Sequence, residues 1–276
     1  MTALIDWFRP NVTMIETRQY NHSRKAGNAG DVWKHFILLT VADSLADTGQ
    51  FTYAETHSGI GTHYLGENGE WQEGIGRVLQ TDCQVFIDNP YFQLAQTHYT
   101  QSQSYLGSWS LLSEHLGKKN GLSCSFHLFD TSSCVAEWFQ SAALPSPVRI
   151  SYLQGDGFKG IHSIMEKPDL VLIDPPYKPE ATSDWHRVND TVLYLLEAQF
   201  PFLAWYPLFG SINPQHLVDS TGRCTYEVQW PLNQSQNLSG CGMIVSPVCE
   251  MILTDNSEML AILANVLNGD FRIFRP

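Results

Sequence analysis

The chain has 276 residues, of which 43% are hydrophobic and 16% are charged, a balance typical of a globular protein with a substantial core. No stretch approaches the ~20 consecutive apolar residues of a membrane-spanning helix, and residues 1–15, which include Asp6 and Arg9, lack the apolar core of a secretory signal. We therefore expect a soluble, cytoplasmic protein with no membrane partner, although its formal net charge of −12 is unfavourable for contact with nucleic-acid phosphates.

Basic side chains are concentrated at the start of the chain. Residues 1–35 carry five basic and three acidic side chains, whereas the rest of the chain carries eleven basic and twenty-five acidic ones. A basic edge on an acidic body would direct RNA to one place and repel it elsewhere. The alternative is that these are ordinary solvated surface charges.

The polar stretch over residues 20–35 leads into the first predicted helix, over residues 31–45. Tyr20 and His22 belong to a mixture of aromatic and basic side chains that suits a nucleic-acid contact. Lys34 and His35 fall one turn into the helix, where they would meet a carboxylate or a cofactor. A capped helix entry without binding function is the alternative.

Seven strands are predicted over residues 51–55, 125–129, 148–153, 170–173, 202–206, 225–230 and 242–247. Apolar runs that alternate with helical patterns indicate an α/β fold with a mostly parallel sheet. The interval between the first two strands is too long for one crossover helix. We predict a helical insertion over about residues 65–107, as a cover for an active site or, equally, as packing for the edge of the sheet.

Polar residues and glycines follow the first four predicted strands. Gly59 lies in a turn after the first strand, together with Glu55 and His57, where a glycine lets backbone amides approach a ligand. Asp130 follows the second strand, and Asp156 with Gly157 follows the third. Ligands of open α/β sheets bind along this edge, so we expect Asp130 to hold ribose hydroxyls, Asp156 to contact an adenine, and Gly59 to border the rest of a cofactor. Each acid taken alone is more often a helix cap.

The motif Asp174-Pro175-Pro176-Tyr177 directly follows the apolar strand over residues 170–173. An amino group conjugated with a purine ring is a poor nucleophile. Hydrogen bonds from that amine to the Asp174 carboxylate and to a carbonyl of the proline loop would localise its lone pair and stabilise the charge that develops. Tyr177 would offer a flat face to an extruded base. A strand-ending turn with an aromatic lid is the alternative.

The six cysteines, at positions 83, 124, 134, 224, 241 and 249, never approach CxxC spacing. The sequence therefore indicates neither a zinc site nor a disulfide framework, and we expect no metal.

Eight stretches resemble the RlmJ (YhiR) family of 23S ribosomal RNA adenine-N6 methyltransferases. They are YNHSRKAGNAGDVWKH (20–35), ETHSGIGTHY (55–64), EWQEGIGRV (70–78), YLGS (105–108), GDGF (155–158), IDPPY (173–177), AWYP (204–207) and CGMIV (241–245). The resemblance implies a Rossmann-like class I fold that uses S-adenosylmethionine, with a seven-stranded sheet and a helical insertion. It also implies protein-free 23S rRNA as the substrate and partner, and we expect a monomer.

Site residues are carried over from the family by matching position. Asp174 is then the catalytic residue, with Pro175 and Tyr177 beside it, and Tyr20, His22 and Tyr177 would meet the substrate. The cofactor positions that the family implies are Lys34, His35, His57, Ser108, Asp130, Asp156, Gly157 and Asp174, and the turn after the first strand adds Gly59. Residues 20–276 form the methyltransferase domain, and residues 1–19 are an extension without an assigned role. Position 130 carries Asp where the family carries Glu, which shortens the ribose contact and keeps its charge.

Three other functions are compatible with parts of the sequence. Methylation of adenine in DNA uses the same chemistry, and the family has been associated with the use of external DNA. A hydrolase would require a nucleophile elbow or a metal motif, and neither GxSxG nor HExxH occurs. A non-catalytic RNA-binding module would be expected to have lost the Asp174 motif, which is intact.

Overall fold

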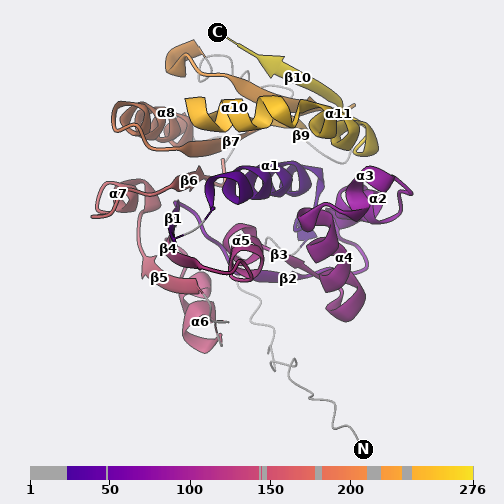
Figure 1. The fold of residues 1–276 in the computed structure, drawn as a ribbon, viewed down its shortest axis with the longest axis horizontal. Helices are drawn as coiled ribbons and strands as arrows, with labels where there is room; N and C mark the ends of the chain where they lie inside the picture. The colour runs from indigo at the N-terminus through magenta and orange to yellow at the C-terminus, as the bar shows by residue number, and fades with distance from the viewer. Residues whose placement is uncertain are drawn as a thin grey trace, which may run out of the picture.

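The structure is a computed structural model that describes residues 24–47, 49–142, 144, 148–177, 182–209, 219–231 and 238–275. Its main sheet has eight strands in the order β10-β8-β9-β7-β6-β1-β4-β5 (Figure 1). The five parallel strands are β1 (Gly49–Glu55), β4 (Leu122–Asp130), β5 (Val148–Gln154), β6 (Leu170–Ile173) and β7 (Phe202–Phe209). The three antiparallel strands are β8 (Thr225–Gln229), β9 (Leu238–Val245) and β10 (Asp270–Phe274).

The predicted α/β class and mostly parallel sheet are confirmed, whereas the predicted number of seven strands is wrong. The strand that the sequence did not reveal is β10, which pairs with β8 at the edge of the sheet. None of its five residues is fully buried. An edge strand of this kind carries no apolar run, which is the signal by which the other strands were found.

The order of the parallel strands reverses at β1. Among these strands, β1 lies between β4 on one side and β6 on the other. In the register, Glu55 at the end of β1 is opposite Leu128 of β4 and Leu172 of β6. The carboxyl ends of β1, β4 and β6 therefore lie side by side at the switch point, where open α/β sheets bind their ligands.

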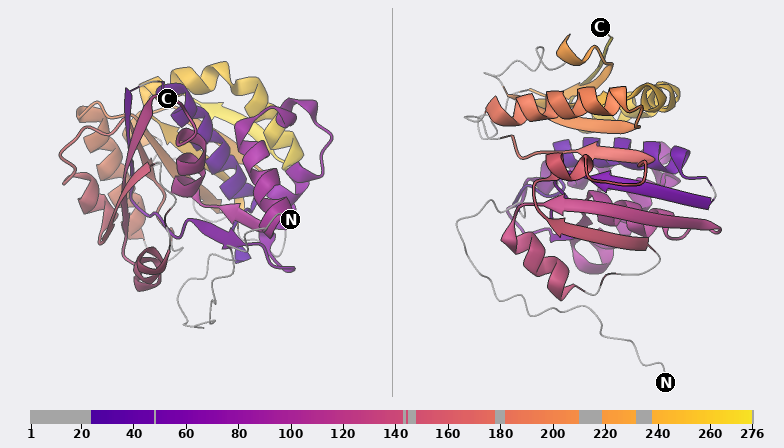
Figure 2. Two further views of the ribbon diagram at one scale, coloured as in Figure 1. Left: turned by 60° about the horizontal axis from the view of Figure 1, so that its bottom comes forward. Right: turned by 90° about the vertical axis from the view of Figure 1, so that its left-hand side faces the viewer.

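Helices cover both faces of the sheet, as two further views show (Figure 2). Residues of one buried cluster come from α1 (Ala29–Leu45), α5 (Ser108–Leu116), α10 (Pro247–Asp255) and α11 (Ser257–Val266). Residues of the second cluster come from α7 (Gly157–Ile161) and α8 (Thr182–Glu197). The helix α6 (Ser133–Ser141) packs its aromatic residues against the first cluster.

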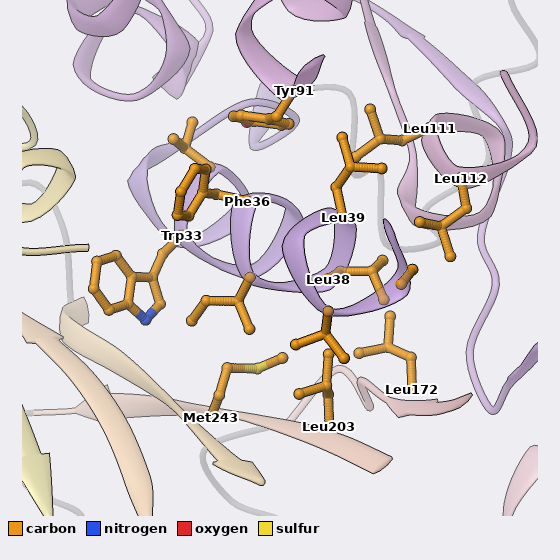
Figure 3. Close-up of a cluster of buried hydrophobic side chains, with 14 of the residues drawn as sticks. Trp33, Phe36, Leu38, Leu39, Tyr91, Leu111, Leu112, Leu172, Leu203 and Met243 are labelled. Atoms are coloured by element: carbon orange, nitrogen blue, oxygen red, sulfur yellow. The ribbon is translucent and has the colours of Figure 1, made fainter. Parts of the chain in front are cut away.

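The central helix α1 is almost completely enclosed. It begins two residues before the predicted helix, with Asn28 as its N-cap, whose side chain accepts a hydrogen bond from the Asp31 amide. Figure 3 shows its apolar side chains between strands and helices: Trp33, Phe36, Leu38 and Leu39 of α1 lie among Leu172, Leu203 and Met243 of the sheet and Tyr91, Leu111 and Leu112 of the helices. Polar residues at the start of the same helix, including Lys34 and His35, are therefore also buried.

The segment between β1 and α5 contains short elements. They are β2 (Thr62–Tyr64), η2 (Glu70–Glu73), α2 (Ile75–Leu79), α3 (Gln84–Ile87), α4 (Pro90–Ser102) and β3 (Ser104–Leu106). The strands β2 and β3 pair with each other, so the segment leaves and returns at one place. Its helix α4 packs on α1, where the ring of Phe36 lies 6.2 Å from that of Tyr91 and 5.7 Å from that of Phe92. The division of the chain into an extension, a domain and an insertion stays a prediction.

Candidate functional site

A cavity of about 1240 Å³ lies at the carboxyl ends of β1, β4 and β6. Pockets for small molecules usually have ~300–1,000 Å³, so this cavity has room for a cofactor together with part of a second molecule. The predicted site residues that line it are Lys34, His35, His57, Gly59, Ser108, Asp130, Asp174, Pro175 and Tyr177. The fold thus brings together residues as distant in the sequence as Lys34 and Asp174, which are 140 positions apart and in direct contact.

A buried network of three charges forms the floor of the site. The Nζ atom of Lys34 lies 2.6 Å from Oδ2 of Asp174 and 3.0 Å from Oδ1 of Asp31. The second carboxylate oxygen of Asp31 accepts a hydrogen bond from the amide of Gly27. Burial alone would favour the neutral amine of Lys34, but the two carboxylates outweigh it and hold its pKa above the usual value. Lys34 is therefore a cation, and it faces the carboxylate of Asp174.

Glu55, at the end of β1, is a buried acid to which the sequence assigned no role. It accepts hydrogen bonds from the hydroxyls of Ser108 and Tyr53, and only 1% of it is exposed. Burial raises the pKa of Glu55 to about 8, although both hydrogen bonds favour its ionised form. The sequence signal that could have identified Glu55 as a site residue is its position at the end of the first strand.

The glycine turn after β1 is held by the side chain of Asp130, at the end of the neighbouring strand β4. The Gly59 amide donates to Oδ2 of Asp130 at 3.0 Å, and the Ser132 amide donates to Oδ1 of the same residue at 2.8 Å. Gly59 has a φ of +56°, and no atom lies within 4 Å of the place where a Cβ would stand. The turn therefore needs glycine for its backbone conformation and leaves open space at that point.

Each of the rings of His35 and His57 has a hydroxyl group within hydrogen-bond distance of its Nδ1 atom. Nδ1 of His35 lies 2.9 Å from the hydroxyl of Tyr105, which in turn lies 2.8 Å from the hydroxyl of Tyr91. Nδ1 of His57 lies 2.9 Å from Oγ1 of Thr56. Burial lowers the pKa of His57 despite the acids around it, which favours a neutral ring.

Asp156 and Gly157 do not line the cavity. Asp156 caps α7 through the Phe158 amide, and both of its carboxylate oxygens lie 2.5 Å from Nη2 of Arg187. Burial alone would raise the pKa of Asp156, but the guanidinium of Arg187 holds it below the usual value. Gly157 packs against the turn after β1, because a Cβ there would stand 1.8 Å from the carbonyl oxygen of Thr56. In this structure both residues have structural contacts, and their predicted role toward a cofactor stays a prediction.

Tyr177 differs from its prediction. The residue borders the cavity, but only 2% of it is exposed, and its hydroxyl donates to the carbonyl oxygen of Trp205 at 2.7 Å. The ring centroid of Trp185 lies 4.6 Å away and that of Trp205 lies 5.9 Å away. The expectation of an open stacking face is not met, because α8 and β7 both bring an indole against the ring.

Tyr20 and His22 lie outside the described residues, so their predicted contact with substrate stays a prediction. Within the described ranges, no helix is long and apolar enough to cross a membrane. In the same part of the chain, no group of three or more His, Cys, Asp or Glu side chains is placed to hold a metal ion.

The strand order, the switch point at β1 and the cavity beside it define the Rossmann-like fold of class I methyltransferases. A protein from Legionella pneumophila, LPL1258, has a crystal structure with the same fold. It matches with a TM-score of 0.73 at 18% sequence identity, over 91% of this chain and 98% of that chain.

Residues 48–270 match the family described as "Ribosomal RNA large subunit methyltransferase D, RlmJ", and the chain belongs to this family. Two similar proteins carry the name Ribosomal RNA large subunit methyltransferase J. The protein from Haemophilus influenzae is 27% identical over 90% of this chain and 93% of its own length. The protein from Escherichia coli (strain K12) is 28% identical over 68% of this chain and 70% of its own length. The resemblance seen in the sequence motifs is thereby confirmed.

Proposed function

We propose that this protein transfers a methyl group from S-adenosylmethionine to N6 of an adenine in 23S rRNA, with Asp174 as its catalytic residue. The observation that carries the proposal is the place of Asp174. Its carboxylate follows β6 at the switch point, lines the cavity and pairs with the buried cation Lys34.

The cavity suits S-adenosylmethionine. Asp130 uses one lone pair of each oxygen for a loop amide, and a carboxylate has about four such sites, so it can also accept from two ribose hydroxyls. The open space at Gly59 would admit the methionine part beside the glycine turn. We assign further contacts to the side chains of Lys34, His35, His57, Ser108 and Asp174, and to Asp156 with Gly157.

The bound cofactor would supply an electrophilic methyl group and would leave as a neutral thioether, with the electron pair of the broken sulfur–carbon bond on sulfur. The residues of this chain would prepare the acceptor nitrogen. The Asp174 carboxylate, which pairs with the Lys34 cation, offers oxygens that accept hydrogen bonds, as the N6 amine requires. A carbonyl of the loop around Pro175 would accept from the second N–H. As the nitrogen forms its bond to the methyl carbon, positive charge develops on it. Asp174 stabilises this charge and then accepts the proton that the nitrogen loses.

The relatives support ribosomal RNA as the substrate, since two of them are named large subunit ribosomal RNA methyltransferases. We further propose that the protein works as a cytoplasmic monomer on protein-free rRNA. Adenine in DNA is the second candidate acceptor, because hydrogen bonds to a base amine do not depend on the sugar.

The test is transfer of labelled methyl groups from S-adenosylmethionine to naked 23S rRNA fragments and to matched DNA. We expect the wild type to form N6-methyladenine in RNA and Asp174→Asn to lose turnover by at least ~100-fold, because one hydrogen-bond acceptor at a reacting centre is worth about that much. Asp190→Asn makes the same change at an exposed site of α8 and should remain active. Label in DNA alone would refute the RNA substrate, and full activity of Asp174→Asn would refute the catalytic assignment.

A further inference from the structure

One wall of the cavity is rich in aromatic residues and lies on the part of β7 that extends beyond the end of β6. β7 pairs with β6 as far as Ala204, opposite Ile173, and then continues to Phe209. Alternate residues of this extension, Trp205, Pro207 and Phe209, line the cavity, as expected for side chains on one face of a strand.

A second row of side chains completes this wall. Leu238 of β9 is opposite Phe209 in the register, and Trp230 follows β8. Trp230 is fixed at two points, because its amide donates to the carbonyl oxygen of Ser239 and its indole nitrogen donates to that of Leu238, both at 2.9 Å. We call Pro207, Phe209, Trp230 and Leu238 the distal wall. Phe209, Trp230 and Leu238 are each partly exposed.

Trp205 connects the distal wall to the charged floor of the site. The Nζ atom of Lys34 lies 5.8 Å from the centroid of the Trp205 ring. A Cβ at Gly30, in the first turn of α1, would stand 3.6 Å from Trp205 and 3.9 Å from Leu238. The wall therefore runs past the start of α1 toward the Lys34–Asp174 pair, and a molecule whose reacting group meets Asp174 has the distal wall beside it.

The charge of the cavity indicates what kind of contact this wall makes. Six side chains that line the cavity are acidic and three, Lys25, Lys34 and Arg77, are basic. Of the basic ones, Lys34 pairs with Asp31 and Asp174, and Arg77 pairs with Glu73. The phosphate groups of a nucleic acid would therefore gain little binding free energy at this cavity, in a protein whose net charge is −12. Stacking of a base on an aromatic ring needs no charge and is worth about 1–3 kcal/mol per base.

We propose that the distal wall holds, by stacking, the unpaired base of a nucleotide next to the target adenine. The inference rests on the proposed function, since it concerns the neighbour of the base that Asp174 would activate. An adenine that leaves its stack exposes the base beside it, and proteins bind unpaired RNA bases on aromatic side chains. Trp230 and Phe209 offer such surfaces at the rim of the cavity.

The test compares two substitutions of Trp230 that both remove the hydrogen bond to Leu238. Trp230→Phe keeps an aromatic face, whereas Trp230→Leu keeps only apolar bulk. The probe is a short fluorescent single-stranded RNA with one central adenine, and fluorescence anisotropy gives its Kd. We expect Trp230→Leu to bind about 5- to 150-fold more weakly than Trp230→Phe, which corresponds to the stacking of one base.

A second probe, in which the bases on both sides of the adenine are replaced by abasic sites, identifies the occupant. Wild type should lose as much affinity on this change as it loses through Trp230→Leu, and the variant should lose little more. The ratio of the Kd values of Trp230→Leu and Trp230→Phe for the first probe should also stay constant as salt is raised, because stacking releases no counterions. Equal affinity of Trp230→Leu and Trp230→Phe, or additive losses from protein and RNA changes, would overturn the inference.

These measurements need no turnover, so they separate this inference from the proposed function. Failure of the wild type to methylate RNA would count against the proposed function and would leave the binding comparison readable. RNA methylation together with equal binding by both Trp230 variants would overturn only the role of the distal wall.

Discussion

Lys34 offers the sharpest test of the charged floor. Lys34→Met keeps most of the side-chain length and removes the cation between Asp31 and Asp174, both within 3.0 Å of Nζ. Only 8% of the lysine side chain is exposed. Removal of one partner from a buried ion pair costs about 3–5 kcal/mol, because the charge that remains has lost its partner. For a chain of this size that corresponds to a fall in Tm of roughly 6–20 °C.

The same variant should change how stability depends on pH. Without Lys34, the carboxylates of Asp31 and Asp174 lose the cation that lies between them. Acid neutralises a carboxylate that has lost its partner, so low pH removes part of the cost that the variant carries at neutral pH. The deficit of Lys34→Met relative to wild type should therefore be largest at neutral pH and should shrink toward about pH 4.

Urea unfolding at neutral pH and at about pH 5 measures both effects. Lys118→Met is the matched control, since Lys118 pairs with Glu114 at the surface with 67% of its side chain exposed, and such pairs contribute about 0–1 kcal/mol. Adding Asp31→Asn to Lys34→Met should restore part of the loss. An equal cost for both lysine variants, or a deficit that does not change with pH, would refute the reasoning.

Two further changes test neighbouring parts of the site. Because the folded pKa of Glu55 is raised to about 8, wild-type stability should decline as pH rises from about 4.5 through that value, and thermal unfolding of Glu55→Gln should show a smaller decline. Gly157→Ala should lose about 1–3 kcal/mol in urea unfolding, because the new Cβ would stand 1.8 Å from the Thr56 carbonyl oxygen. Gly155→Ala, whose nearest atom would lie 4.0 Å away, should be nearly neutral, and equal losses for the two would refute the packing argument.

The sequence predicted those parts of the molecule that depend on local pattern. Asp174 follows a run of four apolar residues, and this run forms the buried strand β6. Gly59 and Asp130 follow strands that end at the same edge, and the structure joins them by a hydrogen bond. The alternation of strands and helices along the sequence shows where each strand ends. Because the strands are parallel, their carboxyl ends lie at the same edge of the sheet.

Contacts between distant segments could not be predicted in the same way. Tyr177 is covered by Trp185 and Trp205, which belong to the next helix and the next strand, and no local pattern indicates that both turn toward it. The ion pair between Asp156 and Arg187 of α8 was not predicted either. The sequence contains the residues of each contact, whereas the packing of whole elements decides which of them meet.

The charged floor is difficult to explain by stability alone. Apolar side chains of similar volume in place of a buried ion network are often neutral or stabilising, by about 1–4 kcal/mol. Lys34 lies on the central helix α1, among some of the most deeply buried apolar residues of the protein, where an apolar side chain would pack readily. The presence of the cation is better explained by the role that we propose for Asp174, because the ion pair holds its carboxylate at the cavity, where it would accept hydrogen bonds from a base amine. The stability of the fold and the position of the Asp174 carboxylate therefore depend on the same two ion pairs, Lys34–Asp31 and Lys34–Asp174.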